Sequence, residues 1–109
     1  MKIDFSKIEE KTFQNLVGGE GETRANIFGD ESNRIMYTTI TPGASIGRHV
    51  HDTSSEIIYV LQGSGKMLFD DGYEELTAGL CHYCPKGHSH SFMNNGTEDL
   101  VFLAVVPEQ

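Results

Sequence analysis

Two short stretches, residues 43–63 and 79–94, constrain the fold of this chain more than any other feature. His49 and His51 are separated by one residue, so on a β-strand their side chains leave from the same face. Glu56 follows after a polar turn, and His90 lies in the second stretch. Two imidazoles, one carboxylate and a third imidazole from a distant strand form the outline of a divalent transition-metal site. The sequence therefore predicts four metal ligands: His49, His51, Glu56 and His90.

The spacing in both stretches resembles the two motifs of the cupin superfamily. The first reads Gly43, five residues, His49-Val50-His51, four residues, Glu56, six residues and Gly63. The second reads Gly79, five residues, Pro85-Lys86-Gly87, two residues, His90, three residues and Asn94. Every fixed position of both motifs is filled, and the spacer is as short as in small single-domain members. The resemblance implies a metal-binding cupin with a double-stranded β-helix (jelly-roll) barrel, and it implies the same four ligands.

The predicted ligand set limits the chemistry of the site without selecting one metal. It suits one divalent transition metal per chain, and manganese, iron, zinc, nickel and cobalt all fit. Three neutral imidazoles and one carboxylate leave such an ion with a net charge of about +1 and, if octahedral, two open adjacent positions. We therefore expect a small anionic ligand that binds through two oxygens, such as a 2-oxo acid, an enediolate, an oxalate-like diacid or a catecholate.

His88 is the candidate catalytic residue, because it lies two residues before His90 and should face the same way. It could act as a general base or as a hydrogen-bond donor beside the metal. The alternative is a solvated histidine at the rim. His82 is a weaker candidate for the pocket.

Three cations are candidates to pair with a substrate carboxylate, although each could equally be a solvated surface charge: Arg24, Arg34 and Lys66. Cys81 and Cys84 would point to opposite faces of a strand, about 10 Å apart. This separation is too large for a disulfide, so we expect packed or edge thiols.

The remaining sequence predicts an all-β fold. Short segments that we interpret as strands, at 24–28, 34–40, 66–69, 73–76, 80–84, 88–93 and 100–106, alternate with turns rich in Gly, Pro and Asn. Asp71-Gly72 is the strongest hairpin signal. This spacing is typical of an antiparallel sandwich or barrel rather than of βαβ units. The more specific jelly-roll prediction comes from the resemblance.

The chain has the length of one domain, with residues 1–23 as an N-terminal arm and residues 24–109 as the cupin β-barrel domain. Ser6 and Glu9 could form a capping box for one short helix. Alternatively, the arm covers a sheet edge or a partner subunit. We expect a homodimer, because an open sandwich exposes sheet edges that need covering. The arm and the apolar strand 100–106 could both do so.

Charge and hydropathy exclude several classes of function. The formal charge of −8 argues against nucleic-acid binding and against docking on an anionic membrane surface. No apolar run approaches the ~20 residues needed to span a bilayer. The first residues lack the features of a signal peptide, so we expect a cytoplasmic protein.

Three functional hypotheses remain. The first is a small metalloenzyme with dioxygenase, decarboxylase or isomerase chemistry. The second is a non-catalytic module that senses or stores a small ligand or metal. The third, a metal-free isomerase-like cupin, is disfavoured by the intact ligand set. A titratable base near the metal would favour catalysis, whereas closure of the pocket by Phe92, Phe102 or the N-terminal arm would favour binding.

Overall fold

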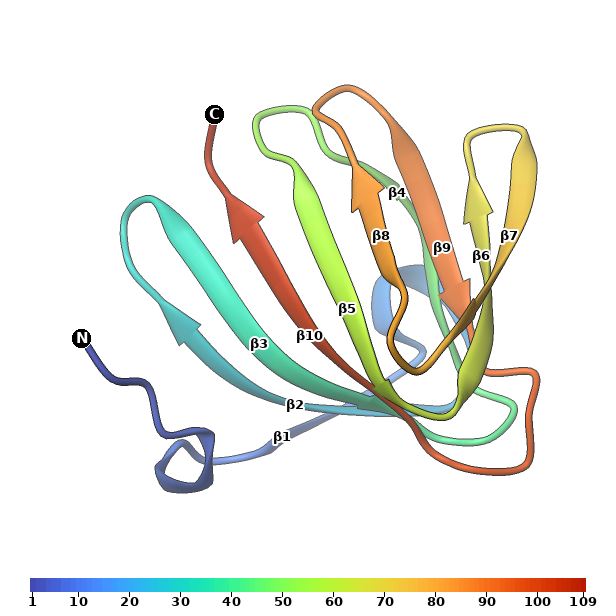
Figure 1. Cartoon of the computed structure of the whole chain (residues 1–109), viewed down its shortest axis with the longest axis horizontal. Coiled ribbons are helices and arrows are strands. Elements are labelled where there is room, and N and C mark those ends of the chain that lie inside the picture. Colours follow the sequence, from blue (N-terminus) through green and yellow to red (C-terminus); the bar gives the residue numbers. More distant parts are fainter.

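The computed structural model describes all 109 residues, and it forms two antiparallel β-sheets that face each other (Figure 1). The six-stranded sheet has the order β1-β2-β3-β10-β5-β8, and the four-stranded sheet has the order β4-β9-β6-β7. The predicted all-β antiparallel architecture is confirmed. No helix is long and apolar enough to cross a membrane.

Ten strands contain more than half of the residues. The six-stranded sheet contains β1 (Lys11–Gln14), β2 (Glu22–Gly29), β3 (Asn33–Ile40), β5 (Glu56–Gln62), β8 (Cys81–Cys84) and β10 (Leu100–Pro107). The four-stranded sheet contains β4 (Ser45–Val50), β6 (Ser64–Phe69), β7 (Gly72–Thr77) and β9 (Ser89–Met93). Two 3₁₀ turns, η1 (Phe5–Lys7) and η2 (Leu16–Gly18), flank β1.

Side chains alternate between the interior and the surface, as the period of a strand requires. On β5, Glu56, Ile58 and Val60 are buried, whereas the residues between them are exposed. Between the sheets, buried apolar residues form one continuous core: Ile40, Ala44, Ile58, Val60, Met67, Leu76, Phe92, Leu100, Phe102 and Ala104.

The N-terminal segment packs on the barrel instead of extending from it. β1 pairs with β2, and η2 lies against β4. The contact is closest at Gly47, where an added Cβ atom would lie 2.0 Å from the carbonyl oxygen of Val17. Only glycine fits this approach. The division of the chain at residues 23 and 24 stays a prediction.

The expected capping box does not form. Asp4 caps the turn η1, and its carboxylate accepts hydrogen bonds from both the backbone N–H and the hydroxyl of Ser6. Ser6 is therefore a donor inside a three-residue 3₁₀ turn and not the first residue of a longer helix.

The hairpin between β6 and β7 turns one residue earlier than expected. Gly72 already belongs to β7, where it pairs with Phe69, so Asp70 and Asp71 form the turn. Asp70 adopts a left-handed conformation with φ of 50°. Asp70 holds this position through backbone and side-chain hydrogen bonds with Ser89, which the sequence signal at Asp71-Gly72 could not reveal.

Candidate metal centre

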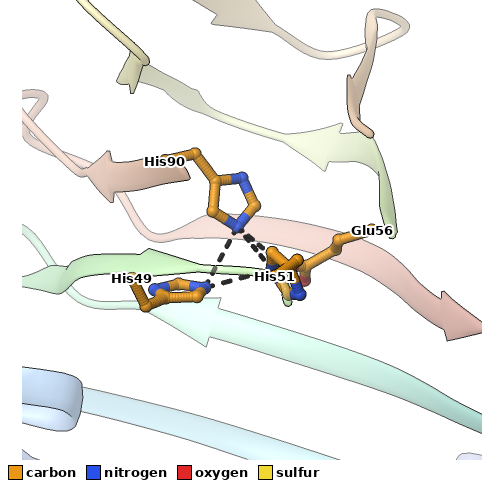
Figure 2. A group of neighbouring side chains, drawn as sticks. All are labelled: His49, His51, Glu56 and His90. Atoms are coloured by element: carbon orange, nitrogen blue, oxygen red, sulfur yellow. Dashed lines mark hydrogen bonds and ion pairs between the residues drawn. The ribbon is translucent and has the colours of Figure 1, made fainter. Parts of the chain in front are cut away.

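The four predicted ligands meet between the two sheets (Figure 2). Nε2 of His90 lies 2.9 Å from Oε1 of Glu56, 3.0 Å from Nε2 of His51 and 3.1 Å from Nε2 of His49. The four ligand atoms all lie within 4.8 Å of one another. We call these four residues the ligand cluster.

Strand pairing and one loop position the cluster. His49 on β4 and His90 on β9 are direct cross-strand partners. The backbone of His51 is tied to the second motif, because its N–H donates to the carbonyl of His88 and its carbonyl accepts from Gly87. The turn of the second motif therefore fixes the loop that carries a ligand of the first.

Each imidazole of the cluster is held from behind by a different partner. Nδ1 of His49 lies 2.8 Å from the carbonyl oxygen of Gly47, and Nδ1 of His51 lies 3.1 Å from Oγ of Ser54. Nδ1 of His90 lies 3.1 Å from Nε2 of His82. Because a carbonyl oxygen only accepts, Nδ1 of His49 carries a proton and, in the neutral ring, Nε2 presents its lone pair to the cluster.

The charges in the cluster are strongly coupled. Burial alone would raise the pKa of Glu56, but its contacts with the three imidazoles outweigh this effect and hold its pKa well below its usual range. The carboxylate of Glu56, 3.9 Å from Nε2 of His49, raises the pKa of His49. Burial lowers the pKa of His90 despite the same carboxylate, which favours the neutral imidazole that a metal requires.

These observations show that the cluster could hold a metal ion. Three imidazole nitrogens and one carboxylate oxygen converge, and acceptor atoms this close together favour the binding of protons or of a cation. Nitrogen and oxygen donors of this kind suit divalent transition metals. The outer nitrogens are already oriented, which is typical of metal-binding histidines.

His82 lies directly behind the cluster. Its side chain is only 1% exposed, and its Nδ1 lies 2.5 Å from Oε1 of Glu74 on β7. The chain of contacts thus runs from Glu74 through His82 to His90. The sequence marked His82 as a weak pocket candidate, but nothing in the spacing revealed its two partners. The pairing of strands places His82 inside: His82 pairs with Ile58, and Ile58 faces the interior on the same side of β5 as Glu56.

His88 lies elsewhere than expected. Its side chain is 45% exposed, its Nδ1 lies 2.6 Å from Oδ2 of Asp70, and its ring stacks on Phe69. It does not line the pocket described below. The strand begins at Ser89, so the alternation that places His90 inside does not extend to His88. Its catalytic role stays a prediction, and this position does not favour it.

A pocket of about 380 Å³ opens in front of the cluster. Phe92 and Phe102 contribute to its wall without filling it, and the arm supplies further apolar lining. The titratable side chains along the wall are the ligand cluster and Arg34.

Of the three candidate cations, only Arg34 reaches the pocket. Arg24 is engaged in ion pairs with Glu10, Glu22 and Asp99. The ammonium group of Lys66 lies 4.5 Å from the centre of the Tyr73 ring.

The two cysteines behave as predicted. Both are free, with Cys81 exposed and Cys84 buried. Burial raises the pKa of the Cys84 thiol to about 11.

Comparisons with known proteins identify the family of this chain. The family model described as cupin domain matches residues 36–106. The chain is 34% identical over 113 residues to the oxalate-binding protein of Thermotoga maritima, covering 97% of this chain and 93% of that protein. A crystal structure of a predicted oxalate decarboxylase from Thermotoga maritima has a TM-score of 0.93 at 30% identity, with 100% of both chains covered.

A sugar phosphate isomerase of the cupin superfamily from Silicibacter pomeroyi shares the fold alone. Its TM-score is 0.83 at 22% identity, and 100% of this chain and 76% of that chain are covered.

The matching family model and the two Thermotoga maritima matches confirm the jelly-roll barrel implied by the two motifs, and the chain belongs to the cupin family.

Proposed function

We propose that this protein binds one divalent transition-metal ion through His49, His51, Glu56 and His90 and, at that ion, a small anionic oxygen ligand of the oxalate class. The convergence of four acceptor atoms, with the outer nitrogens of the imidazoles already held, carries this proposal. The Thermotoga maritima relative named an oxalate-binding protein supports the ligand class.

The residues of the chain favour such a ligand in two ways. A bound divalent ion supplies a Lewis acid that attracts oxygen anions. Glu56 cancels only one of its charges, so the centre keeps an excess positive charge for an anion. The apolar lining beside the cluster lowers the local dielectric constant and strengthens that attraction.

Metal content and oxalate binding test the proposal. Protein purified without an affinity tag should take up about one equivalent of metal, and the His51→Ala and His90→Ala variants should lose it. His88→Ala is the matched control and should retain it. Far-UV circular dichroism checks that each variant is folded. Calorimetry should then detect oxalate binding only to metal-loaded protein. Full metal content in both ligand variants would place the site elsewhere.

Turnover is the second candidate function. The crystal structure of a predicted oxalate decarboxylase from Thermotoga maritima favours it, at 30% identity. The pocket wall favours binding, because its titratable side chains are the ligand cluster and Arg34, and a general acid or base must reach the substrate. Release of CO₂ and formate from oxalate would establish decarboxylation, whereas saturable binding without products would support a binding protein.

We also propose a homodimer, in which a second copy covers the outer face of β5. Three apolar side chains are exposed there side by side on alternate positions: Ile57, Tyr59 and Leu61. Tyr83 of the neighbouring β8 extends this face. Sedimentation equilibrium should show a dimer, and Tyr59→Lys should dissociate it. A monomeric parent protein would exclude the proposal.

A further inference from the structure

The pocket is larger and more apolar than a bare diacid requires. At about 30 Å³ per water molecule, a volume of 380 Å³ holds roughly a dozen waters. Away from the cluster its wall is built from apolar side chains of β2, β3, β4 and the arm, which we call the apolar chamber: Phe13, Leu16, Ala25, Ile27, Met36 and Ile46. Oxalate has no hydrocarbon part to place against these residues, so it would leave the chamber wet.

Arg34 lies at the same level of the sheet as Glu56. Val106 of β10 pairs with Arg34 on one side, and Val105 pairs with Ile57 on the other. Val106 therefore separates Arg34 from Glu56, and two strand spacings put their Cα atoms about 10 Å apart. Both residues line the same pocket.

The charge of Arg34 is not matched by the protein. No carboxylate lies within ion-pair distance of Arg34, whereas Arg24 on β2 has three. A chain with a formal charge of −8 has many carboxylates available. The side chain at the pocket is thus free to contact an anionic group of a ligand.

The chamber also contains a polar atom without a partner. Thr23 is completely buried, lines the pocket, and its Oγ1 makes no hydrogen bond with the protein. A buried hydroxyl is normally paired, so an unpaired one on a pocket wall marks a site that a ligand or its water completes.

We propose that the pocket takes a 2-oxo acid with a hydrocarbon side chain. The ligand cluster, once loaded with metal, and Arg34 together hold the carboxylate and oxo oxygens, and the side chain lies in the apolar chamber. This inference rests on the proposed function, because the acid head uses the same metal-loaded cluster as oxalate. It replaces a bare diacid with an amphipathic ligand.

A length series of ligands tests the inference directly. Calorimetry on oxygen-free, metal-loaded protein compares oxalate with the straight-chain 2-oxo acids from pyruvate to 2-oxohexanoate. Each methylene that enters the chamber should tighten binding about fourfold, so 2-oxohexanoate should bind roughly 60-fold more tightly than pyruvate.

Three variants separate the head of the ligand from its side chain. Arg34→Gln should weaken binding of oxalate and of every 2-oxo acid by about tenfold or more, because it removes a charge-assisted contact. Ala25→Leu should weaken only the longer acids, because it fills the chamber without touching the cluster. Ile27→Phe serves the same purpose at a half-buried position if the first filling variant does not fold.

The outcomes distinguish this inference from the proposed function. If oxalate binds but the affinity for the 2-oxo acids stays constant or falls as they lengthen, the inference is overturned and the proposed function is left intact. Metal loading without binding of any of these acids overturns both. Length-dependent binding that Ala25→Leu or Ile27→Phe abolishes, while oxalate affinity is kept, supports the inference.

Discussion

His82 and His88 are built alike but lie in different surroundings. Nδ1 of His82 bonds to Glu74 at 2.5 Å, and Nδ1 of His88 bonds to Asp70 at 2.6 Å. Both rings also contact Phe69. Only His82 is buried, and only the imidazole of His82 contacts an imidazole of the ligand cluster. The pairing of a histidine with a carboxylate therefore does not by itself indicate its role. The role depends on the group that the other ring nitrogen contacts.

The contacts of His82 give the hydrogen-bond chain a direction. Glu74 accepts from Nδ1 of His82, so Nε2 of the neutral ring can accept from Nδ1 of His90. That tautomer of His90 leaves its Nε2 lone pair in the ligand cluster. His82 thus positions His90 for a metal, whereas the nitrogens of His88 have no route to the cluster.

Removal of His82 should produce the largest difference between the two histidines. Partners that orient a metal-binding histidine typically contribute 10- to 100-fold in affinity, so we expect a loss of about that size in His82→Leu. His82→Gln should recover part of it, because the amide oxygen still accepts from His90. Competition with a chelator of known affinity measures the loss. His88→Ala is the matched control and should bind metal as the parent does.

A purely packing role for His82 makes a different prediction. Leucine and glutamine would then differ only in how well they fill the space, and the tautomer of His90 would not change. Nitrogen-15 NMR of the metal-free protein reports that tautomer directly. Equal metal affinity in His82→Leu and the parent would exclude the positioning role.

The carboxylates that pair with the two histidines, Glu74 and Asp70, should differ in the same way in their effect on metal affinity, but by a smaller factor. Glu74→Gln keeps an oxygen that accepts from His82 but removes the charge, and Glu74 is partly exposed to solvent, which screens it. We expect metal affinity to fall severalfold, and Asp70→Asn to leave it unchanged. In the double variant with His82→Leu, the Glu74 substitution should have no further effect, because the two act through one chain. Additive losses would show that they act independently.

The sequence predicted the parts of the site that depend on local spacing. The motif glycines permit turns that other residues could not form: at Gly63, φ is +81° and an added Cβ atom would lie 2.5 Å from the carbonyl oxygen of Asp99. The His-x-His spacing places His49 on β4 and His51 in the loop just after it, and the remaining two ligands follow from the motifs.

The sequence named Arg34 and His82 only as candidates, because their contacts depend on pairing between distant strands. Arg34 faces the pocket through the register of β3 with β10, and His82 lies behind His90 because β8 pairs with β5. The spacing of residues within one strand does not reveal how β3 pairs with β10 or how β8 pairs with β5. His88 was misplaced for the opposite reason, since alternation was extended one residue beyond the strand. The pocket itself could not be predicted, because its volume depends on how the arm and both sheets pack.

The smallest predicted effect concerns the exposed pair of Asp70 and His88. The hydrogen bond from His88, together with that from the backbone of Ser89, holds the pKa of Asp70 below its ordinary value of 3.8. Because the folded-state pKa is lowered, the pair stabilises the protein above the ordinary pKa, and this contribution is lost as the pH falls through the folded-state pKa. Both side chains are exposed, so the effect on stability should be small.

In an NMR titration, His88→Ala should raise the pKa of Asp70 part of the way back to its ordinary value, because the backbone N–H of Ser89 still donates to its carboxylate. His82→Leu should leave this pKa unchanged, and a shift of equal size in both variants would mean that the two histidines are coupled after all.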